Sequence, residues 1–214
     1  MRQVTVVLIA LTLAASSIAE KNISTEVLLG YADNTTAASS SGVLFGESFA
    51  DSFSQSDDSN SYGLRVSYNF TNSFAAELSY HDYGEAEYSY IDDFGDQIND
   101  KVNTGSINVG IKGFLPISEY VDLTCRLGMS RWDLESKSTD SSIPGEVFSF
   151  QKKDKDIYYS VGVDYDFGEN IFFGLEYSVL KMNWGESFSD ESFSSSSDIE
   201  HEVKNISLSI GMKY

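Results

Sequence analysis

The chain has few of the residues that form disulfide bonds or membrane-spanning helices. Its 214 residues include one cysteine, Cys125, which excludes a disulfide within the chain. After residue 15 no apolar run is longer than three or four residues, whereas a helix needs about 20 to cross a bilayer. A long hydropathy window averages out the period-two pattern of membrane-spanning strands, so this shortage excludes membrane helices and not membrane strands.

Positive charge is also scarce. The chain has 14 lysines and arginines against 33 aspartates and glutamates, a formal charge of -19. Nucleic-acid phosphates are bound by basic side chains, so we expect no nucleic-acid partner. Four segments, residues 32–61, 82–102, 133–156 and 184–203, hold 24 of the acids and only five bases. The acidity is therefore predicted to cap one end of the molecule.

The first 19 residues are predicted to be a signal peptide. Arg2 precedes an apolar run of 12 residues, Val4 to Ala15, and Ser17-Ile18-Ala19 places small residues where a signal peptidase reads. Cleavage after Ala19 leaves residues 20–214, which we interpret as one domain. A retained N-terminal anchor is the alternative, but 12 residues are too few to cross a bilayer as a helix.

Strict alternation of apolar and polar residues predicts eight β-strands. Residues 62–70 and 74–80 alternate around a short break, and the pattern recurs at 107–111 with 121–129 and at 159–165 with 171–177. Residues 26–31 and 203–214 add one strand each. An even strand number is what single-chain bacterial barrels require.

The spacing of the strands predicts a membrane barrel. Breaks of about three to six residues alternate with breaks of roughly 20 to 30, as expected when short turns lie in the periplasm and long loops outside. The polar face carries charges that a soluble core could not hold, namely Arg65, Glu77, Lys112, Arg126 and Glu176. We therefore predict an all-β, eight-stranded, antiparallel up-and-down transmembrane β-barrel with both termini in the periplasm.

These charges are predicted to form an ion-pair network inside the barrel. Glu77 and Glu176 would be balanced by Arg65, Lys112 and Arg126, with Asp164 and Lys213 as further inward candidates. One interpretation is a network that plugs and rigidifies the barrel. The alternative is a gate that re-pairs to pass small ions. We favour the plug.

Little in the sequence indicates catalysis or a cofactor. The two histidines are His81, expected to point inward at the upper rim, and His201, expected in an acidic loop. Neither has a distinctive serine partner, so we predict no catalytic residue, no metal site and no cofactor. The similar segments at residues 46–51 and 185–190 are either a shared ligand-binding element or extensions of hairpins above the membrane. We favour the extensions.

The chain resembles the small outer-membrane barrels of the OmpA/OmpX type, including the surface-antigen group of Gram-negative bacteria. The resemblance rests on residues 62–84, 126–133 and 162–165 and on the terminal strand, whose alternating residues resemble the signal read by the barrel-assembly machinery: Ile206, Leu208, Ile210, Met212 and Tyr214. OmpA continues into a periplasmic domain, which is not expected here because the chain stops at Tyr214.

The resemblance implies a monomeric surface protein of the cell outer membrane, in contact with lipid and lipopolysaccharide. We expect a non-catalytic structural or interaction role, with an extracellular ligand or host surface as partner. The alternatives are a narrow pore for ions or small solutes and a lipid-A-modifying enzyme.

Overall fold

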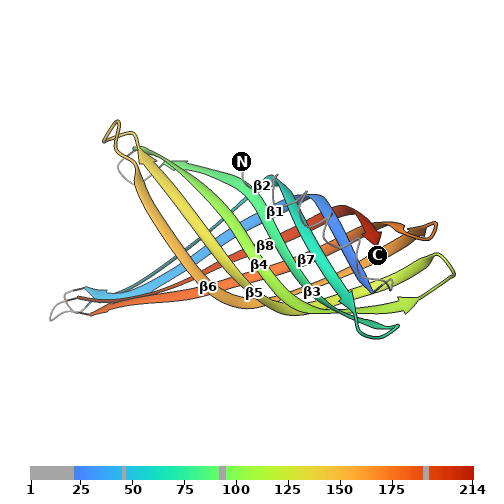
Figure 1. Ribbon diagram of the computed structural model, residues 1–214. Coiled ribbons are helices and arrows are strands. Elements are labelled where there is room, and N and C mark those ends of the chain that lie inside the picture. Colours follow the sequence, from blue (N-terminus) through green and yellow to red (C-terminus); the bar gives the residue numbers. More distant parts are fainter. Residues whose placement is uncertain (1–21, 45–46, 92–94, 190–192) are drawn as a thin grey trace.

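Eight antiparallel strands close into a barrel in the computed structural model of the protein (Figure 1), which describes residues 22–44, 47–91, 95–189 and 193–214. The predicted fold is therefore confirmed, while the signal peptide and Ala19 lie outside the described residues. The described residues include no helix long and apolar enough to cross a membrane. The strands are β1 (Ile23–Leu44), β2 (Glu47–Asn69), β3 (Phe74–Ile91), β4 (Gln97–Pro116), β5 (Val121–Asp140), β6 (Phe148–Phe167), β7 (Ile171–Ser189) and β8 (Phe193–Lys213).

Short turns and both ends of the described chain lie at one end of the barrel. Only residues 70–73, 117–120 and 168–170 separate the strands there, and Gly168 adopts a φ of 79°, which glycine tolerates best. The backbone N–H of Tyr214 donates to the carbonyl of Ile23 at 2.8 Å, so β8 closes onto β1. Short turns and paired termini mark the periplasmic end.

Apolar side chains form a belt on the outside of the barrel next to this end. Leu29, Ile111, Leu127 and Leu208 are each more than half exposed, and the same outward positions of the other strands are also apolar. A soluble barrel would bury such residues, whereas lipid solvates them. Because lipid cannot pair backbone groups, the ladder must close, as it does here.

The strands are longer than a membrane requires. They run for 18 to 23 residues, whereas about 9 to 11 tilted residues cross a bilayer. Most of each long segment that we expected to be a loop therefore continues a strand beyond the membrane. These segments are therefore better described as hairpin extensions than as loops. Strands rich in serine and aspartate can form there because a strand surrounded by water needs no apolar outer face.

The extended part of the barrel divides into two sheets. The β2–β3 ladder ends at Tyr62 and Asp82, and the β6–β7 ladder ends at Tyr158 and Leu180. Beyond these pairs, β7, β8, β1 and β2 form one four-stranded sheet, and β3 to β6 form the other. Figure 1 shows the blue and red-orange tips of the first sheet diverging from the green and gold tips of the second. We call them the β1 sheet and the β4 sheet.

The barrel interior has two layers. At membrane level it is polar and holds the buried charges, which we describe below. Above it, toward the two sheets, buried apolar residues form a cluster that includes Trp132, Leu134, Leu180, Met182 and Val203. The polarity of the inward-facing side chains thus changes along the barrel. The interior is polar at the level where lipid surrounds the barrel, and apolar at the level where water surrounds it.

Candidate functional site

The buried charges inside the barrel form a continuous ion-pair network around two arginines. Arg65 Nη1 lies 2.9 Å from Glu176 Oε2 and 3.1 Å from Glu26 Oε2. Arg126 contacts the same Glu176 oxygen through Nη1 at 3.0 Å and Glu77 Oε2 through Nε at 3.1 Å. Each guanidinium thus bridges two carboxylates, a geometry in which the planar donors of arginine satisfy several acceptors at once. Strands on opposite sides of the barrel are linked across the lumen.

Lysine completes the network toward the periplasm. Lys112 Nζ lies 2.7 Å from Asp164 Oδ2 and 3.8 Å from Glu26 Oε1. The structure therefore brings together all five residues of the predicted network, Arg65, Glu77, Lys112, Arg126 and Glu176, and adds Asp164 and Glu26. We call these seven residues the luminal network. The other inward candidate, Lys213, pairs with Asp166 at 2.6 Å, nearer the periplasmic mouth.

Sequence reasoning missed Glu26, although its signal was present. Val27 and Leu29 face outward. Side chains alternate along a strand, so Glu26 and Leu28 must face the interior. The sequence predicts a strand over residues 26–31, but its inward and outward faces were not assigned, so Glu26 was not placed in the lumen. Its side chain is only 1% exposed and is shared by all three bases of the network.

The apolar layer closes the lumen above the network. The rings of Trp132 and Trp184 lie 5.7 Å apart, and Trp132 Nε1 donates to Asp156 Oδ2 at 2.8 Å. Met182 and Ala86 are fully buried beside them. We call this cluster the apolar plug. Two filled layers of different chemistry therefore lie one above the other inside the barrel.

His201 lies beside the apolar plug, and its predicted place in a loop is wrong. It belongs to β8, is 0% exposed, and its ring nitrogens lie 2.7 Å from Thr36 Oγ1 and 3.2 Å from Thr104 Oγ1. Burial without a nearby carboxylate lowers the pKa of His201 to about 4. The imidazole is thus neutral at pH 7 and links β8 to β1 and β4.

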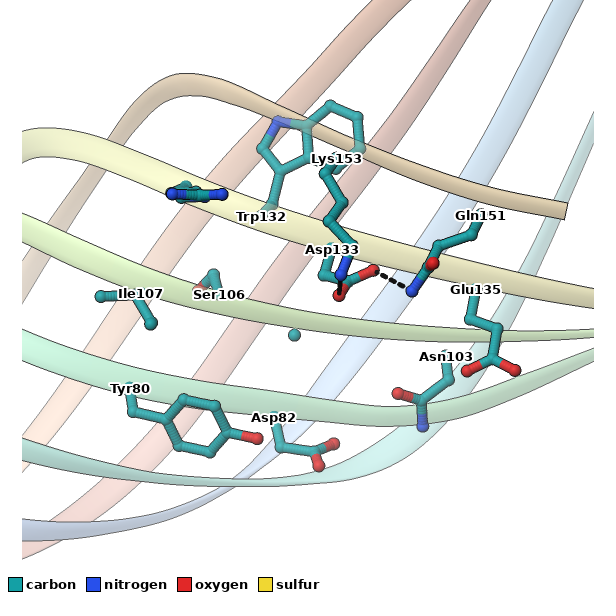
Figure 2. Close-up of a pocket in the computed structure, with 12 residues that line it drawn as sticks. Tyr80, Asp82, Asn103, Ser106, Ile107, Trp132, Asp133, Glu135, Gln151 and Lys153 are labelled. Atoms are coloured by element: carbon teal, nitrogen blue, oxygen red, sulfur yellow. Dashed lines mark hydrogen bonds and ion pairs between the residues drawn. The ribbon is translucent and has the colours of Figure 1, made fainter.

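A hollow lies on the outer wall of the barrel just above the apolar belt. It has a volume of about 310 Å³, and its lining includes Tyr80, Ile107, Arg131, Asp133 and Lys153. Figure 2 shows Lys153 and Gln151 converging on Asp133, with distances of 2.6 Å and 3.1 Å to its carboxylate oxygens. The hollow combines an apolar lower edge with a charged upper edge.

Comparison with known proteins identifies the family. The chain matches the outer membrane protein beta-barrel domain over residues 5–214. It belongs to this family of outer-membrane barrels. The protein is thus a barrel of the outer membrane, with its short turns in the periplasm and its two sheets outside the cell.

Solved structures of other outer-membrane barrels share the fold at low sequence identity. Neisserial surface protein A is 11% identical with a TM-score of 0.51, covering 86% of this chain and 97% of its own. The protease OmpT from Escherichia coli is 14% identical with a TM-score of 0.51, covering 92% and 98%. Ail of Yersinia pestis, solved in complex with the heparin analogue sucrose octasulfate, is 17% identical with a TM-score of 0.40, covering 86% and 99%. No curated protein matches the chain.

The family match and the two structures with TM-scores of 0.51 agree with the barrel fold, and the activity has to be argued from the residues of this chain. His81 is 3% exposed inside the barrel and stacks on Tyr83 with ring centroids 5.6 Å apart. Within the described ranges, neither His81 nor His201 contacts a carboxylate, and no group of three or more histidines, cysteines and acids could hold a metal ion.

The residues of the predicted assembly signal lie on the outer face of β8. Ile206, Leu208, Ile210 and Met212 alternate outward and are each 43% to 66% exposed, and Tyr214 follows the strand end. The structure places them on the strand whose pairing with β1 closes the barrel.

Proposed function

We propose that the protein is a non-catalytic surface protein of the outer membrane that contacts an extracellular partner through its β1 and β4 sheets. The observation that carries this proposal is the division of the extracellular half into two diverging four-stranded sheets. A barrel that served only as a membrane plug would need no strands of this length. Loops and extensions on a rigid barrel are where such proteins carry binding functions.

The inner faces of both sheets offer apolar binding surface. Phe53 of the β1 sheet is 56% exposed, and Phe148 and Phe150 of the β4 sheet are 52% and 42% exposed. By strand parity all three are on the side that faces the lumen lower down. Exposed aromatic side chains on a concave surface are typical of binding sites, since they contribute large contact area.

A cavity of about 800 Å³ adjoins the β1 sheet, lined by residues that include Ala38, Phe53, Trp184 and Ile199. The indole N–H of Trp184 is buried and has no hydrogen-bond partner among the described residues. A ligand acceptor entering the cavity would satisfy this donor. We therefore place the candidate binding site between Trp184 and the exposed aromatics.

A narrow pore is the second candidate, and the luminal network and the apolar plug argue against it. Every side chain of the network is at most 9% exposed, so ions would have to break several charge pairs and then cross an apolar layer. The enzyme alternative has little support among the described residues. His201 lies beside the hydroxyls of Thr36 and Thr104, but it is 0% exposed and, within the described chain, neither histidine contacts a carboxylate that would orient it as a base. If the protein is not a lipid-A-modifying enzyme, as we propose, a deletion strain should show an unchanged lipid A acylation pattern.

Trimming one hairpin tests the proposal. Thr36 and Gln55 are register partners, so an Asn-Gly turn can replace residues 37–54 without a change of register. A deletion strain is complemented with the wild type, with this trimmed variant, or with Trp184→Phe, and adhesion to cultured epithelial cells and serum sensitivity are measured.

We expect the trimmed variant to match the deletion strain and Trp184→Phe to be weaker than the wild type. As a matched control, Lys137→Gln on the outer surface of the β4 sheet should behave as wild type, since this side chain is exposed and Glu135 is its one ion-pair partner among the described residues. If the trimmed variant restored the wild-type phenotype fully, the role would lie in the membrane-embedded half and the proposal would be wrong.

A further inference from the structure

The basic residues of this acidic protein are almost all neutralised, and the exceptions lie together. Among residues 22–44, 47–91, 95–189 and 193–214, every lysine and arginine but three has a carboxylate oxygen within 4.0 Å. The three are Arg131 on β5 and Lys152 and Lys155 on β6. In a chain with 33 acids, unpaired bases on two adjacent strands indicate a site for an anion from outside the protein.

Two of these bases face outward at a defined depth. Arg131 and Lys155 are direct register partners, and the next outward-facing pair toward the membrane is Met129 with Ile157. Met129 and Ile157 are 52% and 59% exposed on the apolar belt. Two residues of a strand rise about 6 to 7 Å, less when tilted. Arg131 and Lys155 therefore lie directly above the hydrocarbon boundary, at the level of the outer headgroups. Lys152 has inward parity and is not part of this pair.

The acids near this pair are engaged elsewhere. In the hollow that Arg131 lines, Asp133 accepts from Lys153 and Gln151, and Asp82 accepts from the hydroxyl of Tyr62 at 2.5 Å. Glu135, the third acid of the hollow, is paired with Lys137 at 2.9 Å. Figure 2 shows Asp133 and Glu135 across the hollow from Tyr80, and Asp82 beside the Tyr80 ring. The two bases thus keep their charge available at the edge of an apolar surface.

We propose that Arg131 and Lys155 bind a phosphate group of the outer-leaflet glycolipid, with its acyl chains along Met129, Ile157 and the belt below. A guanidinium beside an ammonium matches the charge and the acceptors of a phosphate monoester. A soluble polyanion is disfavoured by the acidic sheets above, whereas a lipid phosphate is held at this depth by its own acyl chains. This site is independent of the function proposed above for the two sheets.

The test uses the purified full-length barrel in detergent and bisphosphorylated lipid A as the probe, with retained lipid counted by native mass spectrometry. The variant is Arg131→Gln/Lys155→Gln. Its matched control is Lys101→Gln/Lys137→Gln, which removes the same charge from outward bases that are paired with Glu85, Glu87 and Glu135. Heat-modifiability on gels verifies that each variant is folded, and Arg131→Lys keeps the charge if the double variant folds poorly.

We expect the double variant to bind at least tenfold more weakly than the wild type, the control to stay within about twofold, and Arg131→Lys to fall between them. Removing the phosphates from lipid A should weaken its binding to the wild type at least as much as the double substitution weakens binding of phosphorylated lipid A. Equal binding by wild type and double variant, or equal binding of the two lipids, would overturn the proposal. Displacement of lipid A by millimolar inorganic phosphate would also overturn it, in favour of a site for soluble anions.

Discussion

Replacing Arg65 by methionine should strongly destabilise the barrel. The network holds four carboxylates and three bases, and Arg65 lies 3.1 Å from Glu26 and 2.9 Å from Glu176. Arg65→Met leaves four buried carboxylates with two bases. Removing one partner of a buried ion pair costs about 3 to 5 kcal/mol, because the remaining charge is uncompensated. The free energy of unfolding is measured by urea titration of the barrel in lipid vesicles, followed by tryptophan fluorescence.

Glu176→Gln is the informative comparison. It leaves three carboxylates and three bases, and glutamine still accepts hydrogen bonds, so we expect a smaller loss of about 1 to 3 kcal/mol. The double variant Arg65→Met/Glu176→Gln should lose less than the two single losses together, because the groups contact each other directly. A loss below about 1 kcal/mol for Arg65→Met, or strict additivity, would refute the reasoning that the network stabilises the barrel through mutual compensation.

Three further variants test other parts of the structure. Gly128→Ala places a Cβ against the carbonyl of Val109 and 2.6 Å from the Tyr158 ring, so we expect a loss of about 1 to 3 kcal/mol in vesicle unfolding, and a negligible loss would contradict the tight packing. The contribution of His201 to the free energy of unfolding should be fully present above pH 6.5 and be lost, by up to about 3 kcal/mol, as the pH drops from 6.5 toward 4, because unfolded histidine binds a proton that buried His201 resists. His201→Gln should remove this part of the unfolding pH profile, and an unchanged profile would exclude His201 as its source. Tyr214→Ala should reduce the amount of heat-modifiable protein in outer membranes while leaving refolding in vesicles intact, and a wild-type amount would refute the assembly signal.

The membrane half of the fold could be predicted because lipid imposes a simple rule on the sequence. Leu29, Ile111 and Leu208 must face outward, so each strand alternates with period two and its polar partners mark the lumen. The same parity identifies Arg65 and Glu176 as interior residues. Their pairing follows from the narrow lumen, in which buried charges must find partners.

The extracellular half could not be predicted in the same detail, because water solvates either face of a strand. Segments such as residues 47–61 contain serine and aspartate at both parities, so alternation is absent although the ladder with β1 is unbroken. The place of His201 was misjudged for this reason. The division into two sheets depends on where the β2–β3 and β6–β7 ladders stop, which no local pattern reveals.

Conductance of the purified protein in planar lipid bilayers tests most directly whether the barrel is closed inside. The luminal network and the apolar plug fill the lumen at two levels, so we predict no current steps above the bilayer baseline at neutral pH. Arg65→Met should leave the baseline unchanged, since the apolar plug remains in place. Reproducible single-channel steps from the folded wild type would contradict a sealed barrel and favour the pore.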